Sequence, residues 1–147
     1  MDFFSAMQIS SSALSAERTR MNLISSNIAN ANSTKTADGG PYKRKDAIFA
    51  ASPAAEKFQA AMDRMRRGGN PAGVQVTQII EDQNPPRLQY DPTHPDANPQ
   101  GYVALPNVNV VEEMADMIAA TRAYEANVSA VQAAKSMALK TLELGTR

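Results

Sequence analysis

Apolar residues recur at alternating steps of four and three positions at both ends of the chain, which predicts two long amphipathic helices. The first stripe has eight members, six of them apolar: Phe3, Met7, Ser10, Leu14, Glu17, Met21, Ile24 and Ile28. The second has ten, eight of them apolar: Val110, Met114, Met117, Thr121, Tyr124, Val128, Val131, Lys135, Ala138 and Leu142. A heptad-like spacing sustained over this length is typical of helices that pair along a seam.

Asparagine and serine residues interrupt the end of the first stripe, so we expect that helix to end between residues 30 and 32. Asn27, Asn30 and Asn32 allow two interpretations. The helix frays into a turn, which is the simpler interpretation and the one we prefer. Alternatively, the asparagines form a polar ladder that bonds to a neighbouring helix or loop.

The second helix carries start and stop signals that agree with its period. Asn109 is placed as an N-cap, and Glu112 follows three residues later, as in a capping box. Gly145 is the expected stop. Further apolar residues lie off the main stripe, including Val111 and Ile118. A helix that is apolar on more than one side is expected to pack against more than one neighbour.

All nine prolines lie between Pro41 and Pro106, so the middle of the chain is expected to be rich in loops. Residues 73–80 are rich in β-branched side chains, which predicts a strand. The chain is expected to turn at residues 84–86 and to return as a partner strand at residues 87–90. Residues 47–50 are a candidate third strand. A short helical face is expected at Phe58, Met62 and Met65.

The predicted fold is mainly α, with long N- and C-terminal helices packing as a coiled-coil-like antiparallel pair. We expect three parts: residues 1–32 and 107–147 form the two helices of an assembly domain, and residues 33–106 form a loop-rich middle with a β-hairpin. Two helices that meet along one seam bury little apolar surface, so the conformational entropy lost on ordering leaves such a unit only marginally stable by itself. This favours a subunit that becomes ordered when copies pack together.

Composition excludes several classes of function. The 15 basic and 15 acidic residues cancel, whereas a nucleic-acid-binding protein usually has a basic excess. Cysteine is absent, so disulfides and thiolate chemistry are excluded. We expect no membrane span and no cleaved signal peptide. No phosphate loop, nucleophile elbow or metal-ligand cluster is recognisable, so we expect neither enzymatic activity nor a cofactor.

Two local features remain for which a functional alternative exists. His94 lies with Asp91 and Asp96 among three prolines; a turn is the preferred interpretation over a metal site. Residues 42–45 form a small basic run, for which a solvated or salt-bridging segment is preferred over a nucleic-acid contact.

The motif that follows the first stripe resembles a signature of the bacterial flagellar rod, hook and hook-associated proteins. It consists of Ser26, Asn27, Ile28, Ala29, Asn30, Ala31 and Asn32, followed by Ser33 and Thr34. Residues 41–45, 73–76, 91–97, 101–103 and 106–114 resemble the FlgC type, the proximal rod subunits of this family. The resemblance covers essentially the whole chain. One departure is the longer link at residues 35–41, which replaces the short sequence found after the motif in many axial proteins.

The resemblance implies a structural subunit of the proximal rod, polymerised through its terminal helices into a hollow shaft that transmits torque. It implies export through the flagellar type III gate without a cleaved leader, and a place in the periplasmic rod of the basal body. The implied partners are further copies, rod subunits of the FlgB, FlgF and FlgG types, and the basal-body ring and adaptor. The alternative is a soluble helical adaptor or secretion chaperone.

Assembly would then use the apolar members of the two stripes. On the first helix these are Phe3, Met7, Leu14, Met21, Ile24 and Ile28. On the second they are Val110, Met114, Met117, Tyr124, Val128, Val131 and Leu142.

Overall fold

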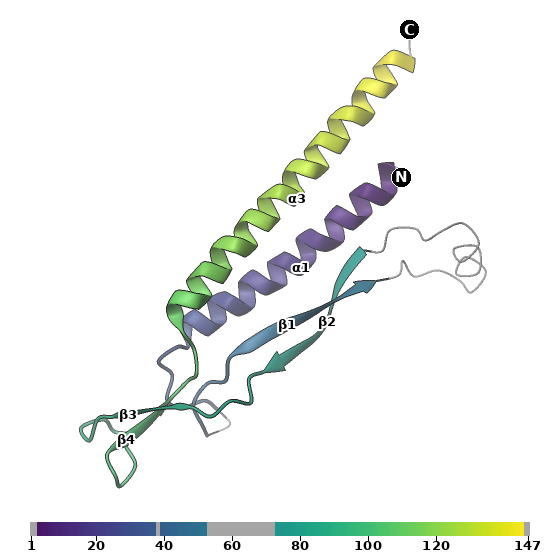
Figure 1. Ribbon diagram of the computed structural model, residues 1–147. Coiled ribbons are helices and arrows are strands. Elements are labelled where there is room, and N and C mark those ends of the chain that lie inside the picture. The colour runs from purple at the N-terminus through teal and green to yellow at the C-terminus, as the bar shows by residue number, and fades with distance from the viewer. Residues whose placement is uncertain (1–2, 38, 53–72, 146–147) are drawn as a thin grey trace, which may run out of the picture. The chain divides into compact units, whose positions relative to one another are not determined.

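The computed structural model describes residues 3–37, 39–52 and 73–145. These residues form α1 (Phe3–Ala29), β1 (Lys45–Ser52), β2 (Gly73–Glu81), β3 (Arg87–Tyr90), β4 (Tyr102–Leu105) and α3 (Val110–Gly145) (Figure 1). The predicted mainly α fold, with a long helix at each end and short strands between them, is confirmed. The short helical face expected at Phe58, Met62 and Met65 lies outside the described residues.

The predicted end of α1 and start of α3 are confirmed, because local signals determine them. In α1 the amide of Asn30 still donates to the carbonyl of Ser26 at 3.1 Å, and the chain then turns. At the start of α3, the Asn109 side chain accepts a hydrogen bond from the Val111 amide at 3.2 Å, as an N-cap does. The helix extends to Gly145, the last residue that the structure describes, so the predicted stop there stays a prediction.

The strands pair differently from the prediction. β1 pairs with β2, and β3 pairs with β4, in two separate two-stranded sheets. The expected hairpin between residues 73–80 and 87–90 is therefore wrong, although both segments are strands. Beyond β2, the Asp82 amide donates to the Arg44 carbonyl at 2.8 Å, which continues the β1–β2 ladder by one step. The two prolines that follow, at positions 85 and 86, have no amide hydrogen and cannot donate to a further step of the ladder.

β3 finds its partner in β4, a strand that the sequence pattern did not reveal. The antiparallel register runs from Arg87 opposite Leu105 to Tyr90 opposite Tyr102. The rings of Tyr90 and Tyr102 meet edge to face, with centroids 5.3 Å apart. Gly101 closes the connection with φ +81°, and a Cβ atom there would lie 2.9 Å from the Tyr90 ring. A residue without a side chain is therefore required at this turn.

Close contacts divide the described chain into two compact units. Unit 1 takes its residues from Met1–Thr19, Phe49–Thr77 and Thr121–Arg147, and unit 2 from Arg20–Ile48 and Gln78–Ala120. Unit 2 holds most of the buried side chains, and its portions of α1 and α3 run antiparallel (Figure 1). Its buried apolar residues are Ile24, Ala31, Val103, Val108 and Ala120. The core of unit 2 is thus small and mostly made of short side chains.

In unit 1, β2 approaches α1 closely. Ser12 donates to the Ile9 carbonyl at 2.7 Å and accepts a hydrogen bond from the Val74 amide at 3.0 Å. A Cβ atom on Gly73 would lie only 2.8 Å from the Ser12 hydroxyl oxygen. Glycine and serine together therefore permit the strand to lie against the helix. Among the described helices, none combines the length with the apolar character needed to cross a bilayer.

Candidate assembly interface

The stripe predicted on α1 lies largely on its packed side. Ile24 is buried, and Met7, Leu14, Met21 and Ile28 are half-buried. Phe3 belongs to the helix, but its side chain lies outside the described part of the structure. The exposed positions of α1 recur at the same four-three spacing on another side and carry mostly small or polar side chains: Gln8, Ser11, Ser15, Arg18, Asn22, Ser25 and Ala29.

The stripe predicted on α3 is divided by the structure. Met117, Tyr124, Val128 and Val131 are half-buried, whereas the other three proposed members are exposed: Val110, Met114 and Leu142. The packed face of α3 instead includes Glu113 and Ala120, both buried. A search for large apolar residues does not select them, because Glu113 is charged and Ala120 is small. Whether any of the predicted residues contacts another subunit stays a prediction.

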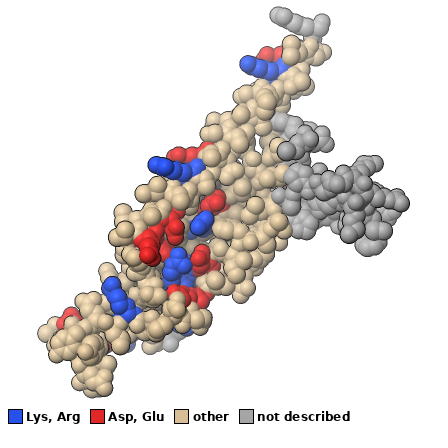
Figure 2. All heavy atoms as spheres, in the orientation of Figure 1, with Lys and Arg blue, Asp and Glu red and all other residues tan. Residues whose placement is uncertain are grey.

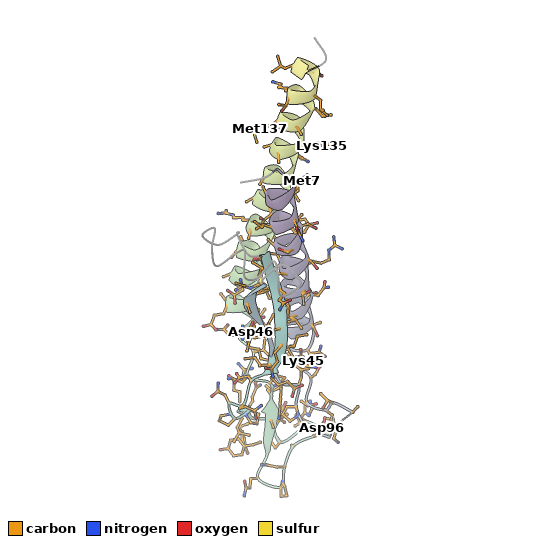
Figure 3. The ribbon with its side chains drawn as sticks, turned by 90° about the vertical axis from the view of Figure 1, so that its right-hand side faces the viewer. Met7, Lys45, Asp46, Asp96, Lys135 and Met137 are labelled. Atoms are coloured by element: carbon orange, nitrogen blue, oxygen red, sulfur yellow. The ribbon has the colours of Figure 1, made fainter. Side chains whose placement is uncertain are left out.

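Large apolar side chains are exposed along α3 in both units. In unit 2, Val111 is 74% exposed, and Met114 and Ile118 are also more than half exposed. In unit 1, Met137, Leu142 and Leu144 are exposed by about two thirds or more (65%, 67% and 77%). Met137 and Lys135 project from different sides of the helix in Figure 3. Some of the apolar residues of α3 are therefore left uncovered by the described part of the chain.

Charged side chains of both signs are mixed on the face that Figure 2 shows. Basic and acidic side chains lie next to one another there, with uncharged surface around them. In unit 2, Lys45 lies 3.6 Å from Glu81, and Arg44 pairs with three carboxylates. The salt-bridging interpretation of residues 42–45 is thus confirmed. Lys45 and Asp46 are labelled at the start of β1 in Figure 3.

The end of α1 is anchored by a buried asparagine. Asn27 is 1% exposed, and its side-chain nitrogen donates to the Lys45 carbonyl at 2.9 Å and to a Glu113 carboxylate oxygen at 3.0 Å. Its side-chain oxygen accepts from the Lys45 amide at 2.9 Å and from the Tyr42 hydroxyl at 3.0 Å. All four hydrogen-bonding positions of the amide are therefore occupied.

Glu113 continues this network toward the link between α1 and β1. Its carboxylate is 1% exposed, and its second oxygen accepts from Arg44 Nε at 2.6 Å. Partial burial alone would lower the pKa of the Arg44 guanidinium, but the hydrogen bond and charge of Glu113, with Asp46, outweigh it and raise that pKa. A buried carboxylate is costly unless it is both paired and hydrogen-bonded, and Glu113 is both. We call Asn27, Tyr42, Arg44, Lys45 and Glu113 the Asn27 network.

The preferred interpretation of the asparagine-rich end as fraying is therefore wrong, and the polar ladder is the correct alternative. Asn30 also takes part, since its side chain donates to the Ser26 carbonyl at 2.8 Å and accepts from the Ser33 hydroxyl at 3.1 Å. Ala31 is buried, whereas Ala29 and Asn32 are exposed. The physical reason is that the Asn27 amide is satisfied by side chains and backbone from other segments, which spacing along one helix cannot reveal.

Sequence reasoning missed Glu113 as a partner of Asn27. The available signal was its position: steps of four and three backward from Tyr124 pass through Ala120 and Met117 and reach Glu113 on the packed face. A lone acid in such a stripe requires a donor, and the basic run at residues 42–45 was one source of such a donor.

The turn around His94 is confirmed. His94 Nδ1 accepts from the Asp96 amide at 3.1 Å, while Asp91 accepts from Thr93 at 2.7 Å. Asp96 is held by Lys35 and Thr34, each at 2.8 Å. Its pKa is lowered, first by the hydrogen bond from Lys35 and then by that from Thr34. In the part of the chain that the structure describes, no three His, Asp or Glu side chains gather as a metal site would require.

Comparisons with known proteins agree at both ends of the chain. The family model described as "Flagella basal body rod protein" matches residues 7–35, and that described as "Flagellar basal body rod FlgEFG protein C-terminal" matches residues 100–144. Several relatives carry the name flagellar basal-body rod protein FlgC. The one from Borreliella burgdorferi is 45% identical, over 93% of each chain. Those from Bacillus subtilis and Escherichia coli O6:H1 are 42% and 41% identical, over 99% of each chain.

Proposed function

Because the chain belongs to the flagellar basal-body rod proteins of the FlgC type, we propose that it is a subunit of the proximal rod that polymerises through its terminal helices. Its role is structural: copies stack into a hollow shaft that carries torque. The names of the relatives describe a rod component and no enzyme. The soluble adaptor or secretion chaperone is not favoured.

One observation carries this proposal, namely the exposed apolar side chains of α3. Val111, Met114 and Ile118 lie at helical spacing in unit 2 and are mostly exposed. Exposed apolar residues at such spacing mark a surface that gains free energy when another protein covers it. A rod subunit must offer surfaces of this kind, because each copy is surrounded by others in a helical assembly.

The proposal extends to the route and the neighbours. We infer that the chain crosses the inner membrane through the flagellar type III export gate and assembles in the periplasm. Its neighbours there are further copies, subunits of the FlgB, FlgF and FlgG types, and the basal-body ring and adaptor. The family likeness at residues 7–35 and 100–144 supports this, since it covers the two terminal helices.

A charge placed on the exposed face of α3 tests the assembly surface. We expect Ile118→Asp to abolish swimming and rod formation in the source bacterium, because burying an unpaired carboxylate between subunits is strongly unfavourable. Gln132→Asp is the matched control, since Gln132 is an exposed polar residue of the same helix. Electron microscopy of isolated basal bodies and swimming assays are the readouts.

The purified Ile118→Asp chain should retain the far-ultraviolet circular dichroism of the wild type, because residue 118 is exposed in the single chain. Normal rods in this variant would show that the apolar face of α3 is not an assembly surface. Loss of rods in both variants would show that the effect is not specific to that face.

A further inference from the structure

We propose that Asn27, Glu113 and Arg44 fix the longitudinal register of α1 against α3 in unit 2. The register decides which residues of each helix are packed within the chain and which remain exposed for a neighbouring copy. The exposure of residues for a neighbouring copy rests on the proposed function. The packing of α1 against α3 concerns the single chain and is tested in the single chain.

The apolar contacts of unit 2 leave the register weakly determined. In the antiparallel arrangement, the hydrogen bond between Asn27 and Glu113 sets one level, and each helix rises 1.5 Å per residue. Ile24, three residues before Asn27, is then level with Met117, four residues after Glu113. A slip of seven residues would bring Ile24 level with Val110, which is also apolar. Because both stripes repeat every seven residues, such a slip replaces one apolar neighbour with another.

The Asn27 network does not tolerate this exchange. After the slip that brings Ile24 level with Val110, Asn27 would lie beyond the start of α3, beside Pro106 and Asn107, and after the opposite slip it would be level with Ala120. Neither position offers a carboxylate in place of Glu113. Glu113 would lose the donor that now lies 3.0 Å from its Oε2. Both groups are 1% exposed in the observed register, so neither can turn to water while the helices stay packed.

The link between α1 and β1 makes the network a three-way junction. Arg44 and Lys45 are consecutive, and Arg44 bonds to Glu113 on α3 while the Lys45 backbone bonds to Asn27 on α1. The chain is thus bonded to both helices at the point where the link enters β1. A single buried polar residue can specify helix register in a coiled coil, at some cost in stability. The network has the geometry for this role, because its partners come from three different segments.

Engineered disulfides measure the register directly, and the absence of cysteine from the sequence makes them unambiguous. The observed register is reported by the Ile24→Cys/Met117→Cys pair, and the slipped register by the Ile24→Cys/Val110→Cys pair. The purified full chain is oxidised under identical conditions, and the fraction cross-linked is measured by mass spectrometry. With the network intact, we expect the first pair to form about tenfold more disulfide than the second. A ratio of this order follows if the slipped register leaves one buried polar group unpaired.

Changing the network should remove this preference, and a matched second change should restore it. Asn27→Asp places a carboxylate beside that of Glu113, so we expect the two disulfides to form in similar amounts. Adding Glu113→Gln supplies an amide that donates to the new carboxylate while its oxygen still accepts from Arg44 Nε. The preference should then recover in part, because the Lys45 carbonyl still lacks the donor that Asn27 supplied. Glu112→Gln is the control, because Glu112 is the exposed neighbour on the same helix.

The proposal is overturned if the two disulfides form equally with the network intact, or if Asn27→Asp leaves the preference unchanged. If Asn27→Asp loses its helical circular dichroism, the decision passes to the Arg44→Leu/Glu113→Leu pair, which removes both charges and keeps apolar bulk. We expect that pair to stay helical and to lose the preference; an unchanged preference overturns the proposal. Because these experiments use the purified chain, they can fail independently of the Ile118→Asp test of assembly.

Discussion

The side chain of Asn27 joins segments that lie far apart in the sequence. Its hydrogen bond to Glu113 spans 86 residues, and those to Lys45 span 18 residues. An asparagine can do this because its amide carries two donors and an acceptor with two lone pairs, and all four positions are filled here. Replacing it therefore removes one hydrogen-bond partner from several polar groups at the same time.

We expect Asn27→Ala to lower the free energy of unfolding by about 2–4 kcal/mol, because the Lys45 backbone, the Tyr42 hydroxyl and the Glu113 carboxylate each lose a partner. Asn22→Ala is the matched control: Asn22 is an exposed residue of the same helix, and the change should stay within about 0.5 kcal/mol. Urea unfolding of the purified chains, followed by circular dichroism, measures both. Similar losses in the two variants would show that the network does not stabilise the chain.

At the scale of elements, the link between α1 and β1 is attached to the loop between β3 and β4 through Asp96. Lys35 and Thr34 both bond to its carboxylate, and Asp96, which is labelled in Figure 3, is half-buried. The pKa of Asp96 is lowered from 3.8 by these two residues. The folded state therefore binds this proton less readily than the unfolded state, so the contact stabilises the fold above the ordinary aspartate pKa.

We expect this stabilisation to disappear as the pH falls below 3.8 and through the lowered pKa of the folded state. Asp96→Asn should be less stable than the wild type near neutral pH, and the difference should shrink in acid. Unfolding measurements across this pH range, with Lys35→Met as a second variant, provide the test. A difference that is constant with pH would mean that the Asp96 carboxylate does not act through its charge.

For the whole molecule, the features that could be predicted from sequence are those that depend on near neighbours. The end of α1 near Asn30 and the cap at Asn109 both follow from local preferences. The partner of β2 and the pairing of Arg44 with Glu113, 69 residues away, depend instead on loop closure and on which polar groups become buried together. Spacing along one element carries no information about such partners. This is also why the fraying interpretation of Asn27 was wrong.

The distribution of burial predicts how the free chain and the rod should differ in amide hydrogen exchange. In the isolated chain, we expect the slowest exchange in α1 near Asn27 and in α3 near Glu113, where side chains are buried. Residues 139–145 of α3 are exposed throughout and should exchange fast, because local opening there removes few packed contacts. In isolated rods the same residues should become protected if, as proposed, copies assemble through α3 and cover its exposed apolar side chains, including Leu142 and Leu144. Uniform protection of α3 in the free chain, unchanged in rods, would contradict assembly through this helix and would favour a chain that is fully folded on its own.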